Sequence, residues 1–424
     1  MSERHLLLVT NTFPYGVGEE FLINEMGFLA EGFDRITVVA TQVAVGAQQT
    51  KDLPANATAI NATPPHRLSG RFGALEKLLQ GTPRTVLSRE ARRRAFRLRG
   101  GARAALWSVY FEARAQAVAR EALRELDIPR LASSDLTIYA FWFHVAARVG
   151  EIIADDVAVE SGRRPRMVMR AHRYDLYEEE SASGVIPQRR ELLAAYDAVV
   201  PISEDGAHYL RTKYPATAHK VVLHRLGTAD PGGRAMLTRS RYHVVSCSSF
   251  AEVKRMPLFA PVLQALTSTG VDVAWTHIGS GPGADDLLAE SRRVAPSVDI
   301  TFAGAMPNDQ VLDRYRTHPI SVLLNLSSSE GVPVSIMEAM SLSIPVVATA
   351  VGGTAEAVID GRNGVLVGRD DPVDVIASAL RRVWELDDEA YDRLCQESRS
   401  VWEERCDMRA VYPPFVALLR SEAP

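Results

Sequence analysis

The sequence contains little cysteine and no long hydrophobic run. Its 424 residues include three cysteines, which lie far apart and form no CxxC pair: Cys247, Cys395 and Cys406. This pattern excludes a disulfide framework and a CxxC-type zinc site, and it suits a reducing compartment. No apolar run approaches the roughly 20 residues of a membrane-spanning helix, and the N-terminal run is too short for a signal peptide. We therefore expect a cytoplasmic protein.

The sequence also lacks an excess of charge of either sign. Lys and Arg number 48 against 52 for Asp and Glu, and the net charge of -4 disfavours general binding to nucleic acid. Residues 84–103 depart from this balance, because their many arginines stand beside a single acid, Glu90. This segment either contacts an anionic membrane surface or a phosphate-bearing substrate, or forms a solvated basic insertion. Its weak apolar face favours the insertion; membrane contact would place the protein at the inner face of the membrane.

Several motifs for cofactor and metal chemistry are absent. Gly16, Val17 and Gly18 follow the first expected strand, but Phe21 stands where a GxGxxG motif requires its third glycine. This disfavours a nicotinamide or flavin enzyme. The sequence shows no HxxxH motif, no DxD at the end of an expected strand and no nucleophile elbow. We therefore predict neither a metal site nor a bound cofactor.

Short apolar runs rich in β-branched residues alternate with helical patterns along the whole chain. This alternation predicts parallel sheets covered by helices on both faces, an α/β fold. The expected strands are residues 5–10, 35–41, 136–141, 166–170, 197–203 and 220–225 in the first half, and 243–249, 271–280, 298–304, 320–327, 344–350 and 364–368 in the second.

The chain divides into two predicted doubly wound domains that face each other across a cleft. The glycine-rich stretch "LGTADPGGRAML" is the best linker candidate. We predict an N-terminal domain over residues 1–228, a linker over 229–238 and a C-terminal domain over 239–408. Residues 409–424 are expected to form a helix that packs back on the N-terminal domain.

The stretch "SSSEGVPVSIMEAM" places two acids, Glu330 and Glu338, around a predicted helix start. Pro333 fits the first helical turn, and the free amides of Val334 and Ser335 would attract phosphate together with the helix dipole. Glu338, one turn further on, could accept hydrogen bonds from ribose, and Glu330 and Gly331 follow a strand end. By spacing alone, a buried helix with two surface acids explains the pattern equally well.

Further polar residues follow other expected strands. Lys254 and Arg255 suit phosphate binding, although such a pair is more often surface charge. Gly279 and Gly281 permit close approach of the backbone to a ligand, or form a plain turn. His172 follows the strand at residues 166–170, with Asp175 nearby; a structural histidine and a site histidine are equally supported.

Together these residues resemble glycosyltransferases of the GT-B fold, in the large retaining family four. The C-terminal segments "VVSCSSFAEVKR", "HIGSGP" and "SEGVPVSIMEAM" carry the specific part of the resemblance. The N-terminal segments "FPYGVGEEFLINEM" and "RAHRYDLYEE" are similar to the subgroup that builds bacterial exopolysaccharide and O-antigen chains. The resemblance implies transfer of a sugar from a nucleotide-sugar donor, most often a UDP-sugar, to a hydroxyl acceptor that is a glycan, a lipid-linked sugar or a small molecule.

The resemblance also implies roles for the candidate residues. Glu330 would contact the donor sugar, Glu338 the ribose, and Lys254 with the amides after Pro333 the diphosphate. His172 would reach the reacting centre. The glycine loop from Gly16 to Gly18, with Val17, would lie near the acceptor.

One position departs from the family pattern. Ser249 stands where the family often has an arginine, five residues before the phosphate lysine; Arg255 would compensate, or diphosphate binding would be weaker. Two alternatives therefore stay open: a sugar-nucleotide 2-epimerase of the same fold, and a catalytically silent partner that binds nucleotide sugar.

Overall fold

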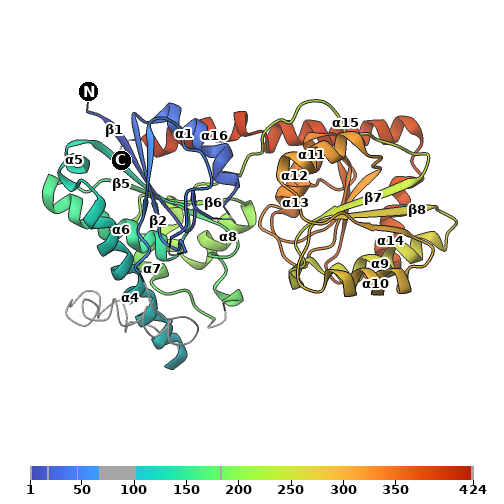
Figure 1. The fold of residues 1–424 in the computed structure, drawn as a ribbon, viewed down its shortest axis with the longest axis horizontal. Coiled ribbons are helices and arrows are strands. Elements are labelled where there is room, and N and C mark those ends of the chain that lie inside the picture. The colour runs from blue at the N-terminus through green and yellow to red at the C-terminus, as the bar shows by residue number, and fades with distance from the viewer. Residues whose placement is uncertain (1, 17–18, 45, 66–101, 182–183, 422–424) are drawn as a thin grey trace. The chain divides into compact units, whose positions relative to one another are not determined.

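The computed structural model describes residues 2–16, 19–44, 46–65, 102–181 and 184–421. Its contacts divide the chain into two compact units (Figure 1). Unit 1 combines Met1–His224 with the C-terminal segment Tyr412–Pro424, and unit 2 is Arg225–Val411. Residues 229–238, which the sequence suggests as a linker, belong to unit 2 by their contacts.

Unit 1 is built on a six-stranded, all-parallel sheet in the order β3-β2-β1-β4-β5-β6. All-parallel sheets are buried on both faces, and β1 alternates accordingly: Leu7 and Val9 belong to one core, Leu6 and Leu8 to the other. The strands are β1 (Arg4–Thr10), β2 (Arg35–Ala40), β3 (Ala57–Asn61), β4 (Asp135–Ala140), β5 (Arg166–Ala171) and β6 (Ala198–Pro201).

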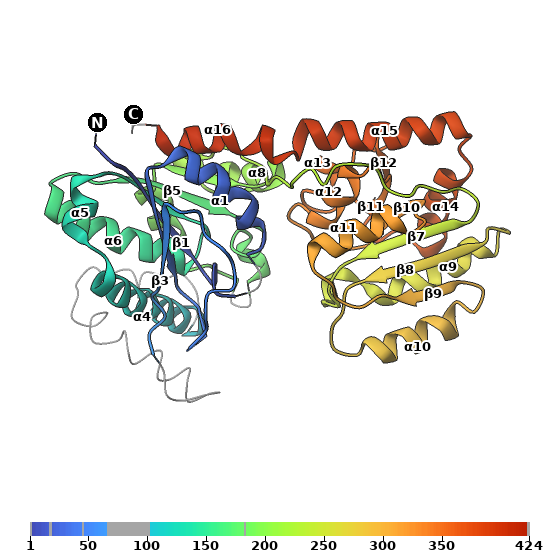
Figure 2. The ribbon, with the colours of Figure 1, turned by 45° about the horizontal axis from the view of Figure 1, so that its top comes forward.

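Helices cover both faces of this sheet. Figure 2 shows α1 and α16 on one face and α4 and α6 on the other. The helices of unit 1 are α1 (Phe21–Gly32), α4 (Ala102–Glu125), α5 (Ile128–Ser133), α6 (Val145–Ser161), α7 (Arg189–Ala195) and α8 (Glu204–Lys213), with the short 3-10 helices η1 (Glu178–Glu180) and η2 (Pro215–Lys220) and most of α16 (Met408–Arg420).

Unit 2 repeats this architecture with a second all-parallel sheet, in the order β12-β11-β10-β7-β8-β9. The strands are β7 (Tyr242–Cys247), β8 (Val273–Ile278), β9 (Asp299–Phe302), β10 (Val322–Asn325), β11 (Val346–Thr349) and β12 (Gly364–Val367). The helices are α9 (Phe259–Thr267), α10 (Ala284–Val294), α11 (Asn308–Thr317), α12 (Val334–Ser341), α13 (Thr354–Ala357), α14 (Val373–Trp384) and α15 (Asp388–Arg405), with the 3-10 helices η3 (Glu252–Lys254) and η4 (Met256–Leu258). Figure 1 shows α9 and α10 on one side of the sheet and α11 and α12 on the other.

The structure confirms the α/β class and eleven of the twelve expected strands, and it corrects the twelfth. Residues 220–225 form no strand of the sheet; Val221 makes one isolated bridge to Val199. The sixth strand of this sheet is β3, an edge strand beside β2 that the sequence prediction overlooked. Its run, "ATAIN", is short and half-exposed, so its hydrophobic pattern is weak. None of the helices in the described ranges is long and apolar enough to cross a membrane.

Candidate donor site and the strand-end residues

The loop between β10 and α12 holds the two predicted acids in fixed positions. Pro333 is the N-cap of α12, so the helix begins one residue later than expected, and the Pro333 carbonyl accepts the amides of Ile336 and Met337 at 3.0 and 3.3 Å. Val334 and Ser335 are therefore the first helical residues, whose amides have no acceptor inside a helix. In unit 2, α12 packs against β10. The start of α12 can thus present amide donors to an anion.

The structure brings Lys254 and Glu330 together. The Lys254 Nζ lies 2.6 Å from the Glu330 Oε1, and the Asn325 Nδ2 lies 3.5 Å from the same oxygen. The two loops are also joined through their backbones, because the Ser328 amide donates to the Val253 carbonyl at 2.7 Å. The Glu330 side chain is 9% exposed and that of Lys254 is 23% exposed, so a ligand can still reach the ammonium. A cation and a carboxylate thus stand beside the helix start.

Arg255 donates hydrogen bonds to two backbone carbonyls. Its Nε donates to the Leu326 carbonyl at 2.5 Å and its Nη1 to the Arg369 carbonyl at 2.6 Å. The residue has a left-handed backbone, with φ of 47°. Its buried Nη2 has no hydrogen-bond partner. The guanidinium thus ties together the loops that follow β10 and β12, and its role toward phosphate stays a prediction.

Gly279 and Gly281 allow two loops to pack directly on each other. A Cβ at Gly279 would lie 1.8 Å from the Ser248 carbonyl oxygen, and the residue has φ of 138°; a Cβ at Gly281 would lie 2.6 Å from the Phe250 Cβ. Ser249 lies between these two contacts. The glycines therefore fix the loop after β7, which leads to Lys254, against the loop after β8.

Glu338 lies on the first two turns of α12, where its carboxylate accepts a hydrogen bond from the Asn308 Nδ2. Burial raises the pKa of Glu338 from 4.5 to about 7, and the Asn308 amide opposes part of that increase. Sequence reasoning missed Asn308, which begins α11, because only the fold brings α11 beside α12.

In unit 1, His172 follows β5 and is 6% exposed. Its ring packs against Trp142 and Phe141, with centroid distances of 4.5 and 4.7 Å. Among the described residues, neither ring nitrogen has a hydrogen-bond partner, and the Nδ1 lies 4.0 Å from the Asp175 Oδ2. Asp175 supports the turn: its carboxylate accepts the backbone amides of His172 at 2.6 Å and Phe143 at 2.5 Å. The structure therefore brings His172 and Asp175 together on a turn that the aspartate holds.

Glu19 is a structural residue of the same region that sequence reasoning missed. Its buried carboxylate accepts the amides of Asn11, Thr12 and Phe13 at 2.9, 2.6 and 2.6 Å, and it also accepts the Trp142 Nε1 hydrogen. It thus binds the loop after β1 to the aromatic residue that packs on His172.

The predicted glycine loop is only partly described. A Cβ at Gly16 would lie 2.9 Å from the Thr12 Cβ, so this glycine permits a tight turn after β1. Val17 and Gly18 lie outside the described residues. Residues 84–101 of the arginine-rich segment also lie outside them, and α4 begins at Ala102.

Comparisons with known proteins agree on the fold. Residues 241–385 match the family described as glycosyl transferases group 1. WcaL of Salmonella typhimurium, named as a colanic acid biosynthesis glycosyltransferase, is 23% identical over 257 residues, which are 59% of this chain and 63% of WcaL. HepE of Anabaena, solved with UDP, aligns with a TM-score of 0.63 at 14% identity over 99% of this chain and 100% of HepE. Sucrose-phosphate synthase from Thermosynechococcus elongatus aligns with a TM-score of 0.68 at 16% identity over 98% of each chain.

The full-length structural likeness and the two all-parallel, Rossmann-like sheets define a protein of the GT-B class. Within that class, the family match lies in the second unit. Residues 241–385 of this unit match the group 1 glycosyl transferases, and the chain spans less than two thirds of the length of WcaL.

Proposed function

We propose that this protein transfers a sugar from a nucleotide-sugar donor to a hydroxyl acceptor, with retention of the anomeric configuration. The observation that carries the proposal is the grouping of Lys254, Glu330 and Glu338 around the start of α12, within the segment that matches the group 1 family. The relative named for colanic acid biosynthesis supports a role in cell-surface polysaccharide or glycoconjugate synthesis. A reaction in the cytoplasm suits its three free thiols.

Unit 2 is the proposed donor-binding unit, and a UDP-sugar is the proposed donor. HepE, which shares the fold, was solved with UDP. The ammonium of Lys254 and the amides of Val334 and Ser335 supply positive charge and donors for a diphosphate. Glu338 supplies an acceptor for ribose hydroxyls, and Glu330 an acceptor for hydroxyls of the sugar. Unit 1 is then the proposed acceptor-binding unit.

The chemistry follows from where charge develops. Breaking the sugar–phosphate bond leaves negative charge on the departing diphosphate, and fixed donors aimed at that charge lower the barrier without a metal. Before the donor binds, Glu330 partly neutralises Lys254 through their 2.6 Å contact. A bound diphosphate would share the Lys254 ammonium with the Glu330 Oε1. The other carboxylate oxygen of Glu330 would then accept a hydrogen bond from a sugar hydroxyl. The acceptor hydroxyl attacks from the face of the leaving group and passes its proton to the departing phosphate. His172 of unit 1 stays a proposed catalytic residue.

The test is nucleotide release from UDP-, GDP- and dTDP-sugars, with and without glycan, lipid-linked and small glycoside acceptors. Acceptor-dependent release of UDP is the expected result. Epimerised sugar nucleotide without acceptor consumption would instead identify a 2-epimerase. Saturable donor binding without release from any pairing would identify a silent partner, to which Ser249 points.

Lys254→Ala and Glu330→Ala are the matched site variants. Each removes a group that acts on the reacting donor, so we expect turnover to fall on the order of 100-fold or more while the fold survives. Arg381→Ala is the control, because it breaks only an exposed ion pair with Glu385 on α14 of the same unit. Unchanged turnover in both site variants would overturn the proposed function.

A further inference from the structure

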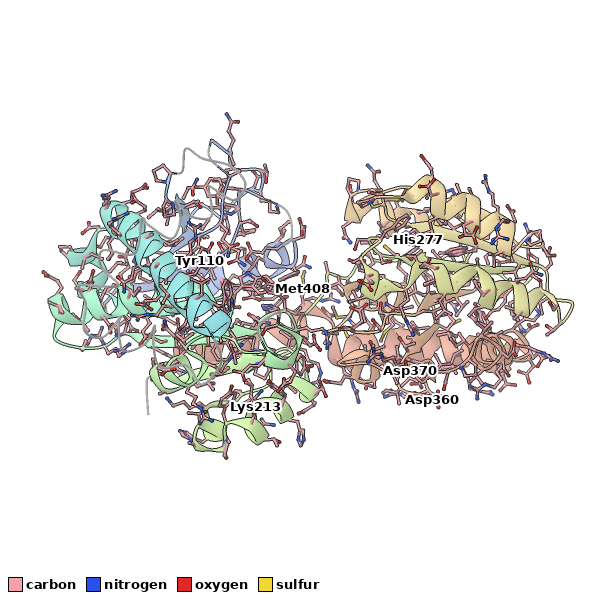
Figure 3. The ribbon with its side chains drawn as sticks, turned by 90° about the horizontal axis from the view of Figure 1, so that it is seen from below. Tyr110, Lys213, His277, Asp360, Asp370 and Met408 are labelled. Atoms are coloured by element: carbon pink, nitrogen blue, oxygen red, sulfur yellow. The ribbon has the colours of Figure 1, made fainter. Side chains whose placement is uncertain are left out.

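Unit 1 contains a polar cavity that none of the donor-site residues line. It measures about 440 Å³ and lies at the carboxyl ends of the parallel strands, where ligands of open α/β sheets bind. We call it the α4 pocket, because α4 supplies one wall; Figure 3 shows Tyr110 on that helix. Its described lining residues are Asn11, Gln42, Val43, Ala44, Thr63, Trp107, Tyr110, Arg114, Trp142, His144, Val145 and Tyr174.

The walls of the α4 pocket suit a sugar ring. Trp107, Tyr110, Trp142 and Tyr174 provide flat aromatic faces, and Tyr174 is 78% exposed, so its ring is available to a ligand. Aromatic faces pack against the apolar face of a pyranose, while amide and hydroxyl groups such as Asn11 accept and donate to its hydroxyls. The pocket therefore combines the two kinds of surface that a saccharide needs.

Arg114 is the unusual residue of this wall. It is 7% exposed, its Nη2 donates to the Thr41 carbonyl at 2.9 Å, and its buried Nη1 has no hydrogen-bond partner. No carboxylate of the described residues forms an ion pair with it, and no Asp or Glu is among the described residues that line the pocket. A guanidinium has five N–H donors, so most of the hydrogen-bond donors of Arg114 remain available to a ligand.

Three other buried arginines of unit 1 provide a comparison. Arg148 lies 3.1 Å from Glu112 and 3.0 Å from Glu151, and Arg170 lies 3.1 Å from Glu25. Arg189 instead donates to two backbone carbonyls, those of Phe143 and Asp175. A buried charge is expensive unless it is paired, and Arg148 and Arg170 obey that rule. Burial lowers the pKa of Arg114, but an arginine stays charged in proteins. Arg114 thus holds a positive charge in a pocket with no anion among its described lining residues.

The α4 pocket also adjoins the histidine of the proposed reacting centre. Trp142 lines the pocket, and the same indole packs on His172 with a centroid distance of 4.5 Å. Asn11, which also lines it, is held by the Glu19 carboxylate at 2.9 Å. A ligand in the pocket would therefore lie one aromatic residue away from His172.

We infer that the α4 pocket binds the acceptor, and that this acceptor is an acidic saccharide whose carboxylate or phosphate pairs with Arg114. The inference rests on the proposed function for its catalytic meaning and deepens it by assigning the acceptor class. The anion supplies the partner that Arg114 lacks, and the aromatic walls hold the ring that carries it.

Binding tests the inference without requiring turnover. Methyl glucuronide, glucose 6-phosphate and neutral methyl glucoside are titrated into the full chain, with ligand-observed NMR and tryptophan fluorescence as readouts. We expect at least one anionic probe to bind about tenfold more tightly than the glucoside, the size of one charge-assisted hydrogen bond. The tighter anion identifies the carboxylate or the phosphate as the acidic group.

Two variants separate charge from stacking. Arg114→Gln should remove the preference for the anionic probes and leave the glucoside affinity unchanged. Tyr174→Ala, at an exposed position that does not threaten the fold, should weaken all three probes alike. UDP binding, which we assign to unit 2, should be unchanged in both. Equal binding of the charged and neutral probes by the wild type, or a preference that persists in Arg114→Gln, would overturn the inference.

The nucleotide-release assay keeps this inference distinct from the proposed function. Anion-selective binding without any acceptor-dependent release would retain the pocket assignment and overturn the transferase. Release with the same KM for acidic and neutral acceptors would retain the transferase and overturn the pocket assignment.

Discussion

At the scale of single residues, Glu338 is an acid whose ionised form the fold destabilises. Its carboxyl is partly buried at the edge of α12, with an amide from Asn308 as its hydrogen-bond donor. Burial raises its pKa to about 7, so the ionised form is costly in the folded state. A carboxylate kept in this position makes sense if a ligand hydroxyl completes its hydrogen bonds.

The raised pKa of Glu338 gives stability a defined pH dependence. Between pH 4.5 and 7 the folded protein binds more protons at this group than the unfolded chain, so its contribution to the free energy of unfolding falls as pH rises. We expect Glu338→Gln to be about 1–3 kcal/mol more stable than the wild type at pH 8, after allowance for partial exposure, and nearly equal at pH 4.5. Urea unfolding at both pH values measures this. A difference that does not change with pH would contradict the prediction.

At the scale of elements, unit 2 depends on close contacts between loops that only glycine permits. Gly353 donates its amide to the Gly331 carbonyl at 2.7 Å, and a Cβ at Gly353 would lie 2.2 Å from that oxygen. Gly279 plays the same part between the loops after β7 and β8. In both places the added Cβ would meet a backbone carbonyl oxygen. A backbone atom cannot move aside as the end of a flexible side chain can.

Gly279→Ala is therefore expected to destabilise unit 2 by roughly 2 kcal/mol or more, since it adds both a clash and a strained φ. It should also weaken UDP binding, because the loop that leads to Lys254 must move. Gly27→Ala is the control: it lies exposed on α1 with nothing within 4 Å of the added Cβ. That variant should gain up to about 1 kcal/mol from helix propensity. Urea unfolding and UDP titration of both variants provide the comparison, and equal effects would refute the steric explanation.

At the scale of the whole molecule, the C-terminal segment belongs to the first unit. Phe415 of α16 is fully buried, lies under the Arg170 guanidinium at 4.2 Å and meets the Tyr139 ring at 5.2 Å. The Leu419 carbonyl accepts the Thr137 hydroxyl at 3.1 Å. The end of the chain thus completes the core that β1 and β4 begin.

This arrangement predicts that the two units respond separately to core mutations. Phe415→Ala should destabilise unit 1 by about 3–5 kcal/mol, although the residue lies beyond unit 2 in sequence. Leu263→Ala, a buried change on α9, should destabilise unit 2 instead. Hydrogen exchange followed by mass spectrometry assigns each loss of protection to a unit. Loss of protection in unit 2 on changing Phe415 would contradict the division.

Local pattern was sufficient for the elements that carry their own hydrophobic signal. The alternation of apolar runs predicted all six strands of unit 2, and Pro333 predicted the start of α12 to within one residue. The edge strand β3 and the false strand at 220–225 show the limit: an edge strand is half-exposed, and an apolar run can pack beside a sheet without joining it.

The sequence by itself determined the class of fold, the start of α12 and the residue types offered at the strand ends, because periodicity and local backbone preference are encoded over a few neighbouring residues. Only the tertiary structure decided which of these side chains contact each other. It paired Lys254 with Glu330 across 76 positions, turned Arg255 onto backbone carbonyls, and buried Arg114 where no described lining residue carries a negative charge. Such partners are set by strand order and packing, which join residues that are distant in the chain and leave no local signal.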